Sequence, residues 1–308
     1  MRIGNTRMIY LVVLALALSL PASALSHMHP KVPQQSRQIQ EAAIHEEEDT
    51  RRSEEAYARE HGQGLKSVQE RFAATGQLIC KNMNGSASVV GNTGTIVTAA
   101  HMFFKRKSCE EINKTSDCSF VTVSKGVEIS IPLGQMVEIG LKCPLPSVPE
   151  DDWAVVKLRS KAIGVKPYTI PFGNPSLSRG QKIIAVNGRN ADIFSLDRTG
   201  RKRFPKTIQD CATGENYYRA DRVVQFESTC ASSAGTSGSA VVQATSFGNV
   251  FAGVTTGNFE AMTDSRAGLT RGESNRGGYR PGEWASVHIP LSGRFLSAIK
   301  AAGTIEPY

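Results

Sequence analysis

Beyond its first two dozen residues, the sequence has no apolar run long enough to cross a membrane, which takes roughly 20 residues. None of its cysteines stands in the Cys-x-x-Cys spacing of a zinc site, and no other constellation of metal ligands is evident. No strand interleaves basic with aromatic residues, and neither internal repeats nor low-complexity tracts occur. We therefore expect a protein that holds no metal or cofactor and does not bind nucleic acid.

The first 24 residues have the layout of a secretory signal peptide. Arg2 and Arg7 precede an apolar run, Met8–Leu20, and small residues follow it. Cleavage is expected after Ala24 or Ser26. A membrane anchor is the less favoured alternative, because a run of 13 residues is too short to span a bilayer. We expect a secreted or periplasmic protein with no stable membrane anchor after signal cleavage.

The remaining chain of about 284 residues carries a modest positive charge. Loss of residues 1–24 lowers the formal net charge from +8 to +6, because they contain two arginines and no acid. Such a charge on an exported protein favours solubility. The basic cluster "DRTGRKRFPK", residues 197–206, is better explained as a solvated hairpin tip than as a site for polyanions. We expect a monomer.

The six cysteines of an exported chain predict disulfides. Six cysteines allow fifteen connectivities in principle. Sequence proximity and the order of the expected elements favour three pairs: Cys109 with Cys118, Cys211 with Cys230, and Cys80 with Cys143.

Residues 25–75 form a charged segment ahead of the main domain. Residues 33 to about 66 are rich in Glu, Arg, Gln and Ala and contain few large apolar side chains. This composition favours a solvated helix that buries little by itself. A surface helix or mobile linker is favoured over a pro-segment that is removed or that shields a site.

From about Gly76 to the C-terminus the sequence has the pattern of short strands that is typical of a β protein. Short apolar or alternating runs, many rich in β-branched residues, are separated by Gly, Asn, Asp and Pro; examples are "TIVTAA", "FVTVS", "WAVVKL", "KIIAV" and "VFAGVTT". The pattern predicts an all-β barrel or sandwich over residues 76–308. After Pro290, the run "LSGRFLSAIKAAG" predicts a terminal amphipathic helix.

The stretch "ASSAGTSGSAVV", residues 231–242, contains the candidate for chemistry, Ser237. Taken alone, it is equally an ordinary turn of small residues. A serine attacks a carbonyl only when a base takes its proton, and the base works best beside a carboxylate. The negative charge that develops on the carbonyl oxygen needs preorganised amides, here those of Gly235 and Ser237. The loop argues against a lipase-type elbow, because Ser239 replaces its second glycine and a strand is expected to follow.

A base and a carboxylate are available at the ends of expected strands. His101 follows the strand "TIVTAA"; four other histidines precede the β-rich region, and His288 lies inside an apolar strand, where a structural role is expected. A lone histidine like His101 would also be interpreted as structural. Asp152 stands directly before an apolar strand, with Glu150 and Asp151 as competitors and a solvated acidic turn as the alternative.

Together, "TIVTAAH", "DDWAVV" and "AGTSGSAVV" resemble the three signature blocks of trypsin-like, chymotrypsin-fold serine peptidases, particularly the secreted bacterial ones. The resemblance covers about residues 76–308. It implies two six-stranded antiparallel β-barrels with the site in the cleft between them. It also implies that His101 is the general base, Asp152 its orienting carboxylate and Ser237 the nucleophile. The amides of Gly235 and Ser237 would form the oxyanion hole.

Two departures from the family pattern bear on activation and specificity. Thr236 stands where the animal digestive members carry an aspartate that pairs with a new N-terminus, so that activation route is not expected. A chain beginning near Arg71 is accordingly expected to be as active as the cleaved native chain. Ala231 stands where trypsin-type enzymes carry the aspartate that recognises Lys or Arg. We expect a pocket for a small or neutral P1 residue, formed by Ala231, Ser232, Thr255 and Thr256.

The leading hypothesis is an exported serine endopeptidase that hydrolyses proteins or peptides through an acyl-enzyme. A non-catalytic binding protein or adhesin on the same fold is the alternative, and an esterase is a third interpretation. The presence of all three catalytic side chains favours the peptidase.

Overall fold

The computed structural model describes residues 50–106, 108–141, 151–173, 175, 177–197, 199–219, 222–246, 248–258 and 285–304. The expected signal peptide and residues 25–49 lie outside the described residues. Within the described ranges, no helix is both long and apolar enough to cross a membrane.

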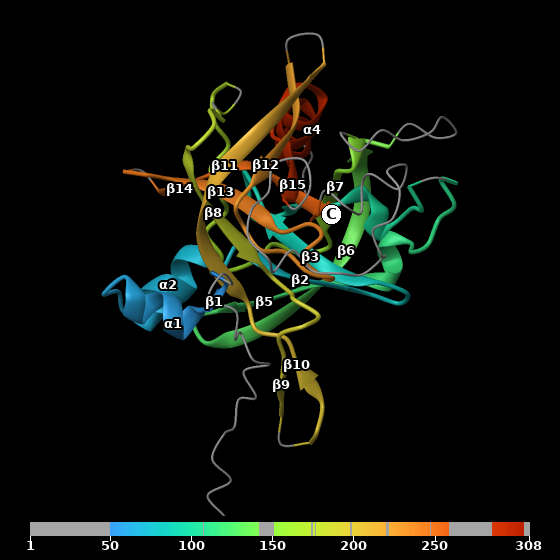
Figure 1. Ribbon diagram of the computed structural model, residues 1–308. Helices are drawn as coiled ribbons and strands as arrows, with labels where there is room; N and C mark the ends of the chain where they lie inside the picture. Colours follow the sequence, from blue (N-terminus) through green and yellow to red (C-terminus); the bar gives the residue numbers. More distant parts are fainter. Residues whose placement is uncertain are drawn as a thin grey trace, which may run out of the picture. The chain divides into compact units, whose positions relative to one another are not determined.

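Six antiparallel strands close into a first barrel in the order β2, β3, β4, β7, β6, β5. They are β2 (Thr75–Cys80), β3 (Asn84–Val89), β4 (Thr95–Thr98), β5 (Cys118–Ser124), β6 (Val127–Ile139) and β7 (Ala154–Leu158), drawn in cyan to green in Figure 1. Every second residue of β5 is buried, which is the period of a strand with one face on a core. β4 and β7 are buried throughout and rich in β-branched residues.

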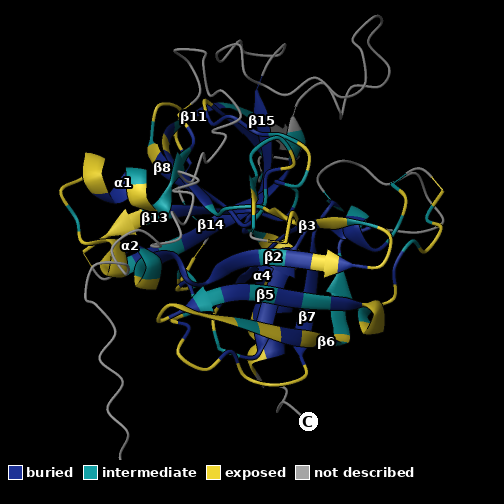
Figure 2. Cartoon of the chain, turned by 90° about the horizontal axis from the view of Figure 1, so that it is seen from below, coloured by how far each residue is buried: buried dark blue, intermediate teal, exposed yellow. Residues whose placement is uncertain are grey.

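A second set of six antiparallel strands follows in the order β11, β12, β15, β14, β13, β8, and pairing of β11 with β8 closes it into a barrel. Its strands are β8 (Lys182–Asn187), β11 (Thr207–Arg219), β12 (Arg222–Ser228), β13 (Ala240–Thr245), β14 (Gly248–Asn258) and β15 (Ser286–Pro290). A short strand, β1 (Arg52–Ser53), adds to β11. The predicted pair of six-stranded barrels is therefore confirmed. Figure 2 shows the buried residues concentrated in the strands.

The predicted terminal helix is also present, as α4 (Gly293–Thr304). It packs against β4, β6 and β7 of the first barrel, although it follows the last strand of the second. Phe295 on this helix stacks on Trp153 with ring centroids 4.8 Å apart. Lys157 Nζ donates to the Ala302 carbonyl oxygen at 2.9 Å, which satisfies an acceptor near the helix C-terminus.

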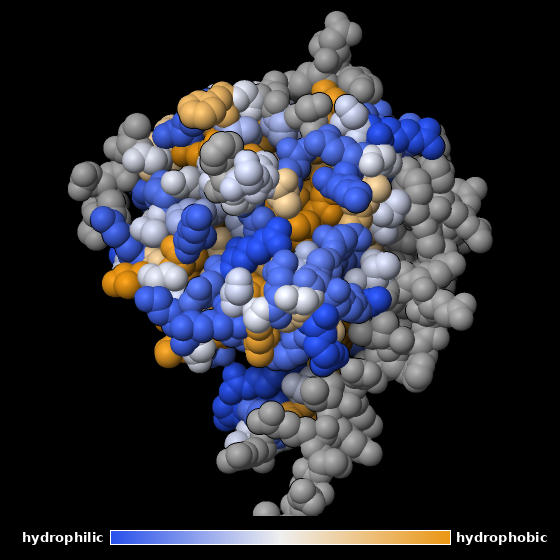
Figure 3. All heavy atoms as spheres, turned by 90° about the vertical axis from the view of Figure 1, so that its left-hand side faces the viewer, coloured by the Kyte–Doolittle hydropathy of each residue, from blue (hydrophilic) through white to orange (hydrophobic). Residues whose placement is uncertain are grey.

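The described part of the charged N-terminal segment forms two helices, α1 (Glu54–Glu60) and α2 (Leu65–Phe72), drawn in blue in Figure 1. The predicted helical character is confirmed there. Packed on the barrels, the segment contributes to the core, because Tyr57 and Phe72 are buried and their rings pack edge to face. Figure 3 looks onto the left-hand side of Figure 1 and shows mainly hydrophilic side chains on the surface. Tyr57, Val68 and Phe72 are buried, whereas Leu65 is exposed.

The predicted activity of a chain beginning near Arg71 concerns a protein without part of this packing. Such a chain would lack the buried side chains of Arg51, Tyr57 and Val68. It would also lack Glu54, whose Oε1 lies 3.4 Å from Lys206 Nζ. Burial lowers the pKa of this lysine.

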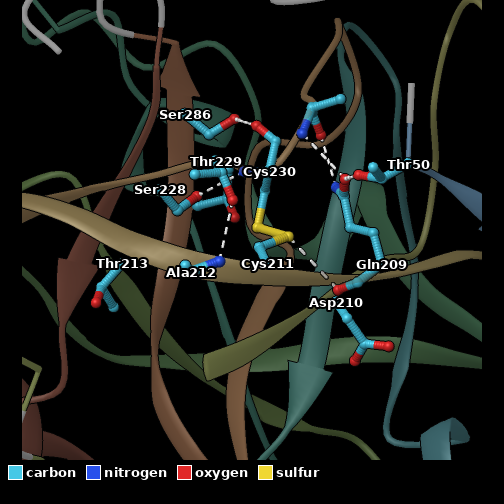
Figure 4. Close-up of a disulfide and its surroundings, with 12 residues drawn as sticks. Thr50, Gln209, Asp210, Cys211, Ala212, Thr213, Ser228, Thr229, Cys230 and Ser286 are labelled. Carbon is cyan, nitrogen blue, oxygen red and sulfur yellow. Dashed lines mark hydrogen bonds between the residues drawn. A yellow bond between two sulfur atoms is a disulfide. The ribbon is translucent and has the colours of Figure 1, made fainter. Parts of the chain in front are cut away.

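The disulfides correct two of the three predicted pairs. Cys80 pairs with Cys118, so the predicted pairs Cys109–Cys118 and Cys80–Cys143 are wrong. The reason is the register of the first barrel, in which β2 and β5 are neighbours and Cys80 lies directly opposite Cys118. The predicted pair Cys211–Cys230 is confirmed (Figure 4). Cys109 is also disulfide-bonded, whereas Cys143 lies outside the described residues.

The basic stretch at residues 197–206 forms the turn and second strand of a hairpin of β9 (Ser195–Leu196) and β10 (Lys202–Arg203), which projects at the bottom of Figure 1. Asp197 closes its turn by accepting from the amides of Thr199 and Arg201 at 2.9 and 3.0 Å. The hydrogen bond from the Thr199 hydroxyl, followed by those from the two amides, lowers the pKa of Asp197. Lys202 and Arg203 are exposed.

Candidate active site

Antiparallel pairing of β4 with β7 brings two predicted site residues to one end of the first barrel. Thr98, at the end of β4, lies opposite Ala154, at the start of β7. His101 follows β4 in a short turn of 3₁₀-helix, η1 (Ala100–Met102), and Asp152 precedes β7. The strand register therefore places the two side chains together, although 51 residues separate them in sequence.

Asp152 fixes the position of His101 through two hydrogen bonds. The His101 amide donates to Oδ1 of Asp152 at 2.8 Å, and His101 Nδ1 lies 2.8 Å from Oδ2. The carboxylate is fully buried, whereas the imidazole remains partly exposed. A proton on Nδ1 completes the second bond and leaves Nε2 as the acceptor. The competitor Glu150 lies outside the described residues.

Arg106 is a third member of this cluster that sequence analysis missed. Its Nε and Nη2 donate to Oδ2 of Asp152 at 2.9 and 2.5 Å, and Nη2 also donates to the Thr256 carbonyl oxygen at 2.6 Å. Nη2 lies 3.0 Å from His101 Nδ1. Burial alone would raise the pKa of Asp152, but the charges of His101 and Arg106 and the bonds from His101 hold that pKa well below its usual range.

No sequence signal separates Arg106 from its neighbours. It stands in the basic run "FFKRK", in which all three basic side chains are equally expected to be solvated. Only the path of the chain after His101 brings its side chain back to Asp152.

The loop that carries Ser237 is held against the first barrel. The Ser86 amide of β3 donates to the Ser237 carbonyl oxygen at 2.8 Å. Gly238 has φ of +88°, and a Cβ at this position would lie 1.9 Å from the Ser86 carbonyl oxygen and 2.3 Å from Thr98 Oγ1. Both the backbone angle and this close approach require glycine. The serine loop therefore lies against the residues that lead to His101.

Two amides of this loop have no hydrogen-bond acceptor within the described residues. The amides of Thr236, Gly238 and Ser239 donate to the carbonyl oxygens of Ser233, Thr255 and Thr236. The amides of Gly235 and Ser237, which alternate with them, donate to no described residue. Gly235 has φ of +93°, which again favours glycine. The loop thus keeps available the two donors that the sequence analysis selected.

The four predicted pocket residues are all buried and come from two elements. Ala231 and Ser232 lie in the loop before Ser237, and Thr255 and Thr256 lie in β14. The backbone of Ala231 is fixed by Gln209, which accepts from its amide at 3.0 Å and donates to its carbonyl oxygen at 2.7 Å. In Figure 4, Gln209 also lies beside Thr50, whose hydroxyl donates to it.

His288 lies behind Thr255 and is fully buried. Its Nδ1 is 3.0 Å from Thr255 Oγ1 and its Nε2 is 2.7 Å from Ser228 Oγ. Burial lowers its pKa to about 3. Both ring nitrogens are therefore occupied by hydroxyl groups, as for a structural histidine. Among the described residues, no group of three or more His, Cys, Asp or Glu side chains is placed to hold a metal.

Comparison with known proteins gives one family and one fold. The family model described as "Trypsin-like peptidase domain" matches residues 85–252. Among solved structures, "Structure of Glu endopeptidase in complex with MPD" is similar with a TM-score of 0.57 and 14% sequence identity. The similarity covers 83% of this chain and 98% of that chain, and at this identity it shows the fold alone. No curated protein matches the chain.

Proposed function

We propose that this chain, which belongs to the trypsin-like peptidase domain family, is an exported serine endopeptidase. It forms an acyl-enzyme on Ser237. Its substrates are proteins or peptides, as the family implies. The observation that carries the assignment is the bond between His101 Nδ1 and the buried carboxylate of Asp152, next to the serine loop.

In the first step, Nε2 of His101 takes the proton of the Ser237 hydroxyl while Oγ attacks the peptide carbonyl carbon. The carbonyl oxygen becomes negatively charged and accepts hydrogen bonds from the amides of Gly235 and Ser237. Asp152 accepts from Nδ1 and stabilises the imidazolium that has formed.

The tetrahedral intermediate then collapses. The C–N bond breaks, and His101 returns its proton to the leaving amine, which leaves the acyl group as an ester on Ser237. Water attacks this ester with His101 again as base, and the second collapse releases the acid and restores the serine hydroxyl. Every proton taken by His101 is returned within one cycle.

Arg106 supports this scheme by keeping Asp152 ionised. Its guanidinium bonds the same Oδ2 atom that faces the imidazole, so a second positive charge compensates the buried carboxylate.

Export is supported by the layout of residues 1–24 and by the disulfides. Cys80–Cys118 and Cys211–Cys230 each join neighbouring parts of one barrel. Such bonds persist in oxidising compartments, outside the cytosol. We propose a secreted or periplasmic location.

Hydrolysis of unfolded casein by the purified protein tests the peptidase assignment, with Ser237→Ala as the control. We expect cleavage by the wild type and none by the variant. A folded wild type that releases no peptides would instead favour the non-catalytic binding protein. The cleavage sites in a peptide library then test the proposed small or neutral P1 residue. A preference for glutamate, the residue in the name of the structurally similar Glu endopeptidase, would overturn that part.

A further inference from the structure

Arg51 is a buried cation whose position the catalytic scheme leaves unexplained. It directly precedes β1, which pairs with the start of β11 in the second barrel. Its side chain is 1% exposed. Because a guanidinium stays protonated in proteins, it can be buried only where carboxylates and other acceptors surround it.

Its partners come from the loop before β9 and from the serine loop itself. The guanidinium binds Asp192 through both of its oxygens, at 3.0 Å from Nη1 and 2.8 Å from Nη2. Nη1 also donates to Asn190 Oδ1 at 3.2 Å and to Ser233 Oγ at 3.1 Å. The Ser233 hydroxyl in turn donates to Asp192 Oδ1 at 2.6 Å. Asn190 and Asp192 precede β9, whereas Ser233 lies four residues before Ser237.

One backbone bond joins the two loops next to Gly235, and another fixes the serine loop on its other side. The Ala191 amide donates to the Ala234 carbonyl oxygen at 2.7 Å. The Thr236 amide and hydroxyl both donate to the Ser233 carbonyl oxygen, at 3.1 and 2.8 Å. Gly235 therefore lies between two residues whose positions depend on the Arg51–Asp192 pair.

We propose that Arg51 is a positioning residue for the oxyanion hole. It holds Asp192 and Ser233 in place, so that the Gly235 amide faces the reacting carbonyl oxygen. The inference rests on the proposed function. The cation that orders this loop is built into the N-terminal segment of the same chain, so a segment that includes Arg51 belongs to the working enzyme.

The rate at which a fluorophosphonate probe labels Ser237 tests the proposal, because the phosphoryl oxygen of the probe occupies the oxyanion hole. In the full exported chain, Arg51→Met should slow labelling about 100-fold, the effect of losing one oxyanion donor. Asp192→Asn should slow it comparably, and the double variant should be no slower than Arg51→Met. Millimolar guanidinium should partly restore labelling of Arg51→Ala.

Arg52→Met is the matched control. Arg52 is the next residue on the chain, is one-third exposed and pairs with Glu60, away from the serine loop. We expect a labelling rate within twofold of the wild type. A purely structural role for Arg51 would lower the melting temperature of Arg51→Met and leave the labelling rate of its folded fraction unchanged, which would overturn the proposal.

Ser233→Ala provides a second route if Arg51→Met does not fold. It keeps the Arg51–Asp192 pair and removes the hydroxyl that joins this pair to the serine loop. We expect labelling to slow about tenfold, and an unchanged rate would contradict the proposal. Absence of labelling in the wild type would contradict the proposed function itself. Labelling at the wild-type rate in both Arg51→Met and Ser233→Ala would contradict this inference alone.

Discussion

At the scale of single residues, the site depends on charges that are buried only because they are paired. Asp152 is fully buried between His101 and Arg106, and Arg51 is fully buried beside Asp192. Strand ends made His101 and Asp152 candidates, and the resemblance of the three sequence blocks to trypsin-like peptidases selected them over the alternatives. Arg51, Asp192 and Arg106 could not be predicted, because their partners are distant in sequence and set by loop paths.

Asp152→Asn tests the role of the buried carboxylate. An amide that donates to Nδ1 favours the wrong tautomer of His101, so kcat should fall about 10⁴-fold while the protein stays folded. Asp151→Asn is the matched control, because it changes the preceding acid, and it should keep activity near that of the wild type. The rate of casein hydrolysis is measured for both variants and for the wild type. Equal activities would show that Asp152 does not orient the base.

The buried His288 predicts a dependence of stability on pH. Its pKa is about 3 in the folded protein, against an ordinary value of 6.5. Below about pH 6.5 the unfolded chain therefore takes up a proton that the folded protein does not, so this histidine lowers stability as the pH falls from 6.5 toward 3. Urea unfolding at about pH 7.5 and about pH 4.5 should show a smaller loss for His288→Gln than for the wild type. An equal loss in both proteins would contradict this account.

At the scale of elements, short β-branched runs between turn residues predict an all-β barrel or sandwich, and the apolar spacing after Pro290 predicts the terminal helix. The division into two six-stranded barrels is implied only by the resemblance to trypsin-like peptidases. The disulfides show where this reasoning stops. Cys80 and Cys118 are far apart in sequence and opposite each other across β2 and β5, so only the strand register identifies them as a pair. The scarcity of apolar residues predicts a solvated helix over residues 33 to about 66. Tyr57 and Phe72 nevertheless meet and bury one face of the pair of N-terminal helices.

Truncation tests the contribution of these helices. A chain that begins at Arg71 loses the buried side chains of Tyr57 and Val68, and removal of a large buried side chain costs about 3 to 5 kcal/mol. We expect its midpoint of urea unfolding to fall well below that of a chain beginning at Thr50. Circular dichroism measures both midpoints. Equal midpoints would show that residues 50–70 are a dispensable appendage.

At the scale of the whole molecule, the site draws on both barrels. His101 and Asp152 belong to the first barrel, whereas Ser237 stands before β13 of the second. The contact of Gly238 with Ser86 and Thr98 brings the serine loop to the first barrel. A second close approach lies at Gly188, where a Cβ would come within 1.9 Å of the Gly76 carbonyl oxygen. The proposed chemistry therefore requires both barrels, folded and docked.

The site of covalent modification by a fluorophosphonate probe tests the central claim most directly. Mass spectrometry of the labelled protein should find one adduct, on the Ser237 hydroxyl. Ser237→Ala should lose it, and Ser239→Ala should keep it, because the buried Ser239 hydroxyl has no hydrogen-bond partner among the described residues. A folded, mature wild type without an adduct, or an adduct that persists in Ser237→Ala, would contradict the account.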